Sequence, residues 1–156
     1  MKHLKGFSLI EMLTTLTLLS VLALAVMPVA QMSQRRVKEQ ELRHALFSIR
    51  KALDQWKTAT DKGEIPAAAA TASGYPPTLK ILAEGIQTTA NQPPRRFLRF
   101  IPRDPFAQSS DLPADQTWQL RSYISPAETP APGEDVYDIQ SKSSELGLNG
   151  IAYREW

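Results

Sequence analysis

The chain contains no cysteine, and its only histidines are His3 and His44. The lack of cysteine excludes disulfide bonds and thiolate metal sites. Two histidines leave little material for a histidine-based catalytic triad or a zinc centre, so an enzyme would need carboxylates and hydroxyls alone. The sequence also lacks nucleotide-binding glycine motifs and metal-binding motifs. We therefore expect a protein that is not an enzyme and has no metal site.

A strong excess of charge is also missing. The formal net charge is +2, and because Lys2 and Lys5 both lie in the first six residues, the remainder carries 16 basic and 16 acidic side chains. Nucleic-acid-binding surfaces need a basic excess, so nucleic acid is not an expected partner. A chain of 156 residues has room for one domain of modest size and an appendage.

Charge is rarest between Phe7 and Ala30, where Glu11 is the only ionisable residue. As a helix, this segment would extend about 36 Å, which is enough to cross a hydrocarbon core of about 30 Å. We therefore predict that residues 7–30 span a membrane. Basic residues stand on both sides of the segment, so the positive-inside rule does not fix its orientation. The other polar side chains of the segment carry hydroxyl groups that can bond to helix carbonyls: Ser8, Thr14, Thr15, Thr17 and Ser20.

A cleaved secretory signal is the alternative interpretation of this segment. It would have a basic start, an apolar stretch and a small-residue cleavage site at Ala23-Leu24-Ala25. The apolar run continues past Ala25 to Ala30, however, and the carboxylate of Glu11 is unsuited to the apolar region of a signal. The membrane span is the better prediction.

Glu11 needs a partner if it is to stay ionised in lipid. A charged carboxylate in the membrane costs on the order of 3 kcal/mol. If the chain were cut between Gly6 and Phe7, the new amino group would lie four residues before Glu11, on the same helix face. Two opposite charges about 4 Å apart gain about 4 kcal/mol at an effective dielectric constant of about 20. The amine could belong to the same chain or to a neighbouring one; alternatively, Glu11 snorkels to the interface or is protonated.

The stretch KGFSLIEML, residues 5–13, resembles the class III signal of type IV pilin-like proteins. In that family a basic leader, here residues 1–6, ends in glycine, here Gly6. Phe7 would be the first mature residue and Glu11 the fifth. Pro28 stands where the helix of this family commonly kinks, and a proline within a span removes one backbone hydrogen bond. The match covers two independent positions, the signal and the proline.

This resemblance implies processing and assembly. A membrane-embedded prepilin peptidase would cut after Gly6 and methylate the amine of Phe7, and glycine suits such a cut because it breaks the helix and exposes the scissile bond. Phe7 and Glu11 would set the register of a polymer, and Pro28 would loosen the helix. The implied topology is a single pass through the inner membrane, with the leader in the cytoplasm and the C-terminal domain in the periplasm.

Beyond the span, residues 31–60 are predicted to continue the helix in amphipathic form. No glycine or proline interrupts the run from Val29 to Lys62, and Glu39 and Arg43 form a favourable pair one turn apart. A stripe of apolar residues recurs at helical spacing, which predicts packing against the protein's own globular part. The stripe consists of Leu42, Leu46, Ile49, Leu53 and Trp56.

Residues 61–156 form the predicted globular C-terminal domain. Eleven of the twelve prolines lie there, which disfavours long helices. Thr78 is the expected N-cap of a short helix that ends before Gly85. Two alternating segments, 117–125 and 136–141, are predicted strands; Trp118, Leu120 and Ile124 share one face of the first, and Tyr137 and Ile139 one face of the second. The expected fold is α+β: a long N-terminal helix whose second half carries a small antiparallel sheet.

This part is similar to the major pseudopilin of type II secretion systems. The similarity lies in the order and spacing of Tyr75-Pro76, the leucine-containing turn 79–82, IPRDPF at 101–106 and YDIQS at 137–141. It implies a non-enzymatic subunit that polymerises with itself and other pseudopilins. The implied partners are an inner-membrane assembly platform, a cytoplasmic assembly ATPase and an outer-membrane secretin. The alternatives are a pilin of a type IV pilus or a competence minor pilin, and a signal-anchored periplasmic enzyme or binding module.

Two stretches of the C-terminal domain could be interpreted either as ligand sites or as ordinary surface. The family's calcium loop corresponds to KSSELGLNG, where Glu145 and Asn149 are a thin ligand set and Lys142 opposes a cation. We therefore expect no cofactor and a tail closed by packing of Tyr153 and Trp156. Four arginines interleave with two phenylalanines, and we expect a solvated face whose aromatic rings pack inward: Arg95, Arg96, Arg99, Arg103, Phe97 and Phe100.

Overall fold

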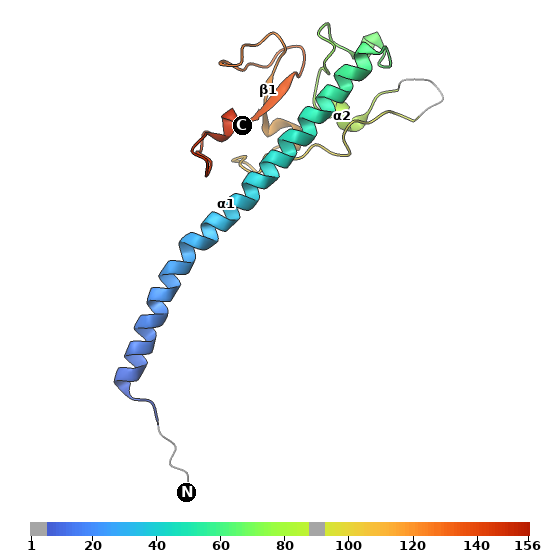
Figure 1. Ribbon diagram of the computed structural model, residues 1–156. Coiled ribbons are helices and arrows are strands. Elements are labelled where there is room, and N and C mark those ends of the chain that lie inside the picture. The colour runs from blue at the N-terminus through green and yellow to red at the C-terminus, as the bar shows by residue number, and fades with distance from the viewer. Residues whose placement is uncertain (1–5, 88–92) are drawn as a thin grey trace. The chain divides into compact units, whose positions relative to one another are not determined.

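The structure is a computed structural model that describes residues 6–87 and 93–156, apart from the side chains of residues 25–28. The fold class is α+β, as predicted, with a long N-terminal helix and a small two-stranded antiparallel sheet in the C-terminal part (Figure 1). The long helix, α1, runs Leu9–Asp61. The chain divides into two compact units, Met1–Val37 and Lys38–Trp156, and α1 contributes residues to both.

The C-terminal end of α1 is set by Gly63. Its backbone has a φ of 71°, which glycine adopts at little cost. Gly63 donates its N–H to the carbonyl of Thr60, and Glu64 donates to the carbonyl of Ala59, at 2.9 Å each. This pair of reversed bonds is the Schellman arrangement, which satisfies carbonyls that a helix end leaves open.

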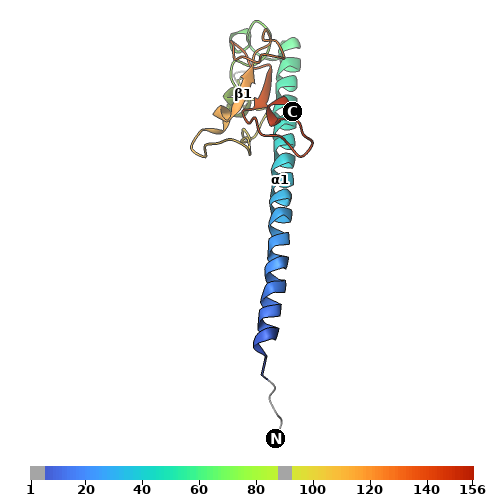
Figure 2. The same cartoon turned by 90° about the vertical axis from the view of Figure 1, so that its left-hand side faces the viewer.

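The predicted stripe of α1 forms the centre of the core in the second unit. All five of its members are buried: Leu42, Leu46, Ile49, Leu53 and Trp56. They join one cluster with Leu82, Trp118, Ile139 and Tyr153 from the C-terminal part. Figure 2 shows the remainder of this unit gathered along one side of its stretch of α1. The stripe therefore packs against the protein's own globular part, as the helical spacing predicted.

The short helix α2 spans Lys80–Glu84, and Gly85 follows it with a φ of 85°. Leu79 and Leu82 are buried in the core. The prediction of Thr78 as the N-cap is wrong. The cap is Leu79, in a helical conformation and without a side-chain hydrogen bond, because the buried leucine rather than the exposed threonine fixes the entry of this helix.

Strands β1 (Trp118–Arg121) and β2 (Asp138–Ser141) pair antiparallel, with Leu120 opposite Ile139. Both are shorter than predicted, and Ile124 is 88% exposed beyond the end of β1. The chain turns after Arg121 because Ser125 bonds locally. Its N–H donates to the carbonyl of Ser122, and its hydroxyl accepts from the N–H of Ala131. Such serine bonds compete with a strand ladder.

The face rich in arginine and phenylalanine is only partly as predicted. Phe97 is half-buried with its ring 5.3 Å from that of Trp56. Phe100 is 71% exposed, so the expectation that it packs inward is wrong. Its neighbour Ile101 instead joins the core at this point of the chain.

The tail ends in a 3₁₀ turn, Tyr153–Glu155. The ring of Tyr153 is fully buried and stacks on Phe106 with centroids 3.8 Å apart, and Trp156 meets Tyr153 edge-on at 5.1 Å. The predicted closure of the tail by these two residues is confirmed. Glu39 and Arg43, predicted to pair with each other, have partners in this tail instead: Glu39 accepts from the hydroxyl of Tyr153, and Arg43 lies over the ring of Trp156.

Candidate processing and assembly site

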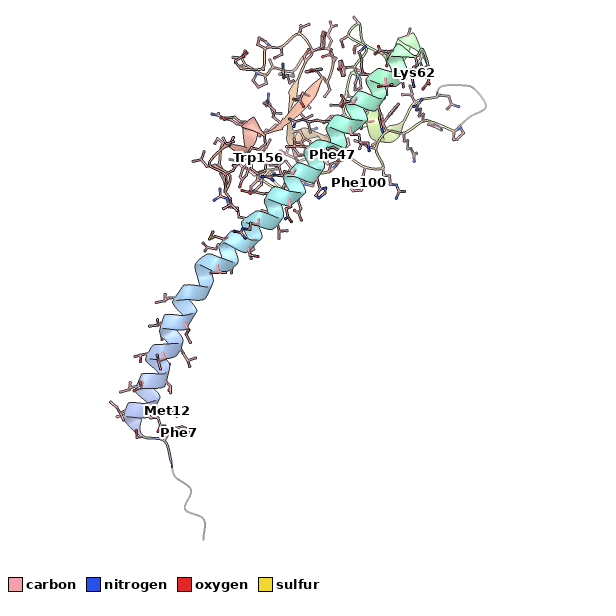
Figure 3. The ribbon with its side chains drawn as sticks, in the orientation of Figure 1. Phe7, Met12, Phe47, Lys62, Phe100 and Trp156 are labelled. Atoms are coloured by element: carbon pink, nitrogen blue, oxygen red, sulfur yellow. The ribbon has the colours of Figure 1, made fainter. Side chains whose placement is uncertain are left out.

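The bond between Gly6 and Phe7 lies in a non-helical stretch just before α1. Phe7 is 74% exposed, and Figure 3 shows it beside Met12 at the start of the helix. A Cβ atom built on Gly6 would meet no atom within 4 Å. Nothing in the described fold therefore covers this peptide bond, and nothing in it requires glycine at position 6.

Ser8 caps the N-terminus of α1. Its hydroxyl oxygen accepts the backbone N–H of Glu11 at 3.2 Å, and its carbonyl accepts the N–H of Met12 at 3.1 Å. Ser8 and Glu11 thus have the spacing of a capping box, in which serine or threonine is followed three residues later by glutamate. The pattern is visible in the sequence, but the interpretation of Glu11 as a charge partner overlooked it.

The cap places Glu11 in the first turn of α1, where the helix dipole favours a negative charge. Cutting after Gly6 would leave the new amine of Phe7 one residue before the cap. Glu11 then lies near two positive ends, the helix N-terminus and the new amine. Gly6, Phe7 and Glu11 therefore lie together at one end of α1.

The hydroxyl groups of the apolar segment are satisfied within the helix. Thr14 and Ser20 each donate to the carbonyl four residues earlier, at 2.6 and 2.8 Å, and Thr15 and Thr17 to the carbonyl three residues earlier, at 3.0 and 2.8 Å. A hydroxyl that is bonded in this way costs little in lipid, whereas an unpaired charge costs much. The carboxylate of Glu11 is therefore the one side chain of residues 7–24 that needs a partner from outside its own helix turn.

The first unit exposes large apolar side chains on all sides of α1. Leu9 is 81% exposed and Leu24 73%, and none of the described side chains of the apolar segment is buried. Among the helices of the described ranges, α1 is the one that is long and apolar enough to cross a membrane. A helix that is apolar all round needs lipid or other helices around it.

Pro28 lies within α1, but its side chain is outside the described residues. Its predicted role in loosening the helix stays a prediction. The roles of Gly6, Phe7 and Glu11 also stay predictions, because the structure fixes their positions and not their chemistry.

The C-terminal loop uses its polar atoms internally. The Oδ1 atom of Asn149 accepts the N–H of Ile151 at 3.1 Å, and the carbonyl of Glu145 accepts the N–H of Tyr153 at 3.0 Å. Within residues 6–87 and 93–156, no group of three or more histidine, aspartate or glutamate side chains is placed to hold a metal ion.

Comparison with known proteins gives one match. Residues 1–27 match the family model described as the prokaryotic N-terminal methylation motif. The matched stretch contains Gly6, Phe7 and Glu11 and ends one residue before Pro28. No curated protein and no solved structure matches the chain.

Proposed function

The methylation motif indicates a type IV pilin-like protein, and from that premise we propose that the chain is a structural subunit of a type II secretion pseudopilus, most similar to its major subunit. Proteins with this motif are structural subunits rather than enzymes. One apolar N-terminal helix together with the motif fits a single-pass protein of the inner membrane, and the motif implies processing by prepilin peptidase and pilus-type polymerisation.

The observation that carries the proposal is the arrangement at the start of α1. An exposed, uncovered peptide bond precedes a capped helix whose first turn holds a lone carboxylate in an apolar segment. Cutting after Gly6 would create a positive amine where Glu11 needs a partner. If that amine belongs to a neighbouring subunit, the charge pair sets the stagger between helices, because an unpaired carboxylate in lipid is costly.

The C-terminal unit supports the choice of a pseudopilin. The segments that carry the similarity contact one another: the N–H of Val136 donates to the carbonyl of Pro76 at 2.8 Å, and the hydroxyl of Ser141 donates to Oδ2 of Asp104 at 2.6 Å. The ring of Tyr75 meets that of Tyr137 edge-on at 5.0 Å. The segments on which the resemblance rests therefore pack against one another in one unit.

In this function the filament would grow as an assembly platform and a cytoplasmic ATPase extract subunits from the inner membrane. It would then act as a piston or plug below an outer-membrane secretin, with the C-terminal domain in the periplasm. Phe47 and Phe100 are 67% and 71% exposed on the second unit (Figure 3), and such aromatic side chains are suited to contacts between neighbouring subunits.

The decisive test is the intact mass and N-terminal sequence of the protein extracted from membranes. A chain that begins with N-methylated Phe7 is the expected result. A chain that begins after Ala25 or Ala30 would show a cleaved secretory signal and would overturn the filament function. Retained biochemical activity in a fragment without residues 1–35 would instead favour an anchored enzyme or binding module.

A second measurement separates the two kinds of filament. Electron micrographs of cells that produce the protein should show short, cell-bound filaments if it is a pseudopilin. Long surface fibres that contain the protein would identify a pilin of a type IV pilus and would overturn the assignment to secretion, while leaving the processing and assembly site intact.

A further inference from the structure

We propose that the turn formed by residues 146–151 is a membrane-contact element, which rests on the surface of the bilayer that holds the apolar half of α1. The proposed ligand is the interfacial layer of that bilayer. This inference uses the membrane span of the proposed function, but it requires neither cleavage nor polymerisation.

The turn is closed and internally bonded. Leu146 and Ala152 form an antiparallel bridge, Gly147 donates to the carbonyl of Ile151 at 2.8 Å, and Gly150 donates to that of Gly147 at 2.9 Å. A Cβ atom on Gly147 would lie 2.7 Å from the ring of Trp156. The backbone is therefore fixed by its own bonds and by close packing, and it presents its side chains in a defined way.

The side chains that this turn presents are aliphatic and exposed. Leu146 is 60% exposed, Leu148 42% and Ile151 46%, although their backbone is ordered and could have carried polar residues. Three of the six residues of this turn are thus exposed aliphatic side chains, and exposed apolar surface that is concentrated in one place can serve interaction.

The turn is bonded to α1 close to the end of the apolar segment. Leu148 donates its N–H to Oε1 of Glu39 at 2.7 Å, and the hydroxyl of Tyr153 donates to the same oxygen at 3.0 Å. Glu39 follows Ala30, the last residue of the apolar segment, by nine residues. At the rise of an α-helix this is about 14 Å. Along the chain, the anchor of the turn is therefore only a short distance from the end of the apolar segment.

Helix tilt can close the remaining distance. The apolar segment is about 36 Å long as a helix, against a hydrocarbon core of about 30 Å. An apolar segment longer than the core is accommodated by tilting. If the tilt brings Leu148 and Ile151 to the layer of headgroups, burial of their aliphatic surface stabilises that arrangement.

The residues around the turn are those typical of a membrane interface. Trp156 donates from Nε1 to the carbonyl of Ile151 at 3.3 Å, and the guanidinium of Arg43 lies 4.7 Å from its ring. Tryptophan is enriched at the level of lipid headgroups, and basic side chains near the surface are attracted to anionic lipids. The stretch from Arg35 to Arg43 carries four basic side chains and two glutamates, so basic residues are in excess. One of the glutamates, Glu39, is buried and bonded to the tail.

The chain offers a matched control at the other end of the same unit. Ile124 is 88% exposed and also aliphatic. It follows Tyr123, whose ring stacks on that of Tyr75 at 5.9 Å, and the neighbouring Gly74 lies against the side chain of Lys57. Lys57 is 18 residues beyond Glu39 on α1, or about 27 Å along the helix. Lipid that contacts Ile151 should not reach Ile124.

The test uses the full chain in nanodiscs that hold one chain each, made of phosphatidylcholine and phosphatidylglycerol. Because the chain has no cysteine, the variants Ile151→Cys, Ile124→Cys and Leu16→Cys each carry a single site for a fluorescent label. Quenching by lipids that are spin-labelled near the headgroup is then measured. We expect quenching at position 151 to be at least about twice that at position 124, and to fall on introduction of Leu148→Asp.

Three other outcomes would overturn the proposal, and each has a distinct meaning. Equal, weak quenching at positions 151 and 124 would show that the turn stays in water. Weak quenching at position 151 in one-chain discs, together with shielding of its label from water in discs with two or more chains, would show that a second copy rather than lipid covers the turn. A label at position 16 that is not quenched by lipids spin-labelled deep in the acyl chain would show that α1 is not inserted, and would remove the membrane span from the proposed function as well.

Discussion

Arg50 of α1 and Asp138 of β2 form an ion pair across 88 residues of sequence, with Nε of the arginine 2.8 Å from Oδ1 of the aspartate. The same guanidinium donates from Nη2 to the carbonyls of Ile139, at 3.1 Å, and Trp156, at 2.9 Å. One side chain therefore ties both the second strand and the tail to the long helix. The planar, forked guanidinium can bind three acceptors at once, and an ammonium group cannot reproduce this geometry.

Arg50→Ala is expected to lower the free energy of unfolding by about 1–2 kcal/mol, because charge-assisted hydrogen bonds are lost at a partly exposed site. The free energy of unfolding of Arg50→Lys should lie between those of Arg50→Ala and the native chain, since lysine keeps the charge but not the forked geometry. Chemical unfolding of the full chain in detergent, followed by tryptophan fluorescence, measures both. Native stability of Arg50→Ala would show that the three bonds contribute nothing net.

Glu39→Ala should be more destabilising than Tyr153→Phe. The alanine variant removes the acceptor of the Tyr153 hydroxyl and of the Leu148 N–H, and each lost hydrogen bond costs about 0.5–1.5 kcal/mol. Tyr153→Phe removes one hydrogen bond and keeps the stacked ring, so a loss of about 1 kcal/mol is expected. The double variant tests the link: strictly additive effects would show that the two residues are not coupled.

The long helix and its stripe were predictable because both are local properties of the sequence. Glycine and proline are absent from Val29 to Lys62, and Leu42 to Trp56 recur at helical spacing. The ends of β1 were not predictable in this way. Ile124 continues the alternation of the strand, but the hydroxyl of Ser125 bonds to the backbone of the following loop and turns the chain. A periodic pattern does not report such local competition.

At the candidate site, the sequence indicated Gly6, Phe7 and Glu11 because a charge within an apolar run is a strong local anomaly. The cap formed by Ser8 was also encoded locally and was overlooked. The contact of Glu39 with Tyr153 could not be predicted from local sequence patterns, because it joins residues more than one hundred positions apart. A helical pattern predicts that Glu39 is near Arg43, but it does not predict that the tail brings a better-placed donor.

Gly6→Ala is expected to abolish or strongly slow removal of the leader without changing the fold. Position 6 has open space and no positive φ, so an added methyl group strains nothing in the chain. Any loss of cleavage then reports recognition by the peptidase. The intact mass of the membrane-extracted protein measures processing, and its unfolding transition should match that of the native chain.

Gly63→Ala provides the opposite control for glycine. Its φ of 71° is unfavourable for a residue with a Cβ atom, so we expect a loss of about 1 kcal/mol in stability with normal processing. If Gly6→Ala were cleaved at the native rate, glycine at the cut would have no role in recognition. If Gly6→Ala were both uncleaved and unfolded, the loss of cleavage would come from the fold, and glycine would have no shown role in recognition by the peptidase.

Acid is expected to destabilise the loop that holds Asp135. Burial alone would raise the pKa of this carboxyl, but hydrogen bonds from the hydroxyl of Ser73 and the N–H of Tyr123 lower the pKa below its ordinary value. A lowered folded-state pKa means that the stabilisation is fully present above the unfolded-state value, about 3.9, and is lost as the pH falls through the folded-state value.

Unfolding measured between pH 7 and pH 2 checks this sign. The native chain should lose stability on acidification below about pH 4, and Asp135→Asn should reduce the dependence in that window. Ser73→Ala removes one of the bonds and should move the loss toward higher pH. An unchanged acid limb in Asp135→Asn would show that other groups govern the transition.

Glu11→Gln separates processing from assembly. The cut after Gly6 should proceed, because the peptide bond lies before the helix and the amide of glutamine fits the same place in the first turn. Assembly should fail or fall steeply, because the variant loses an ion pair worth about 4 kcal/mol at an effective dielectric constant of about 20.

Ser8→Ala is the matched control. It weakens the helix cap by about 1 kcal/mol but keeps the carboxylate, so it should still polymerise. Crosslinking of subunits in membranes, together with the intact mass, measures both steps in one sample. If Glu11→Gln formed filaments as well as the native chain does, the carboxylate would have no part in setting their register, and the proposed pairing with the new amine would be wrong.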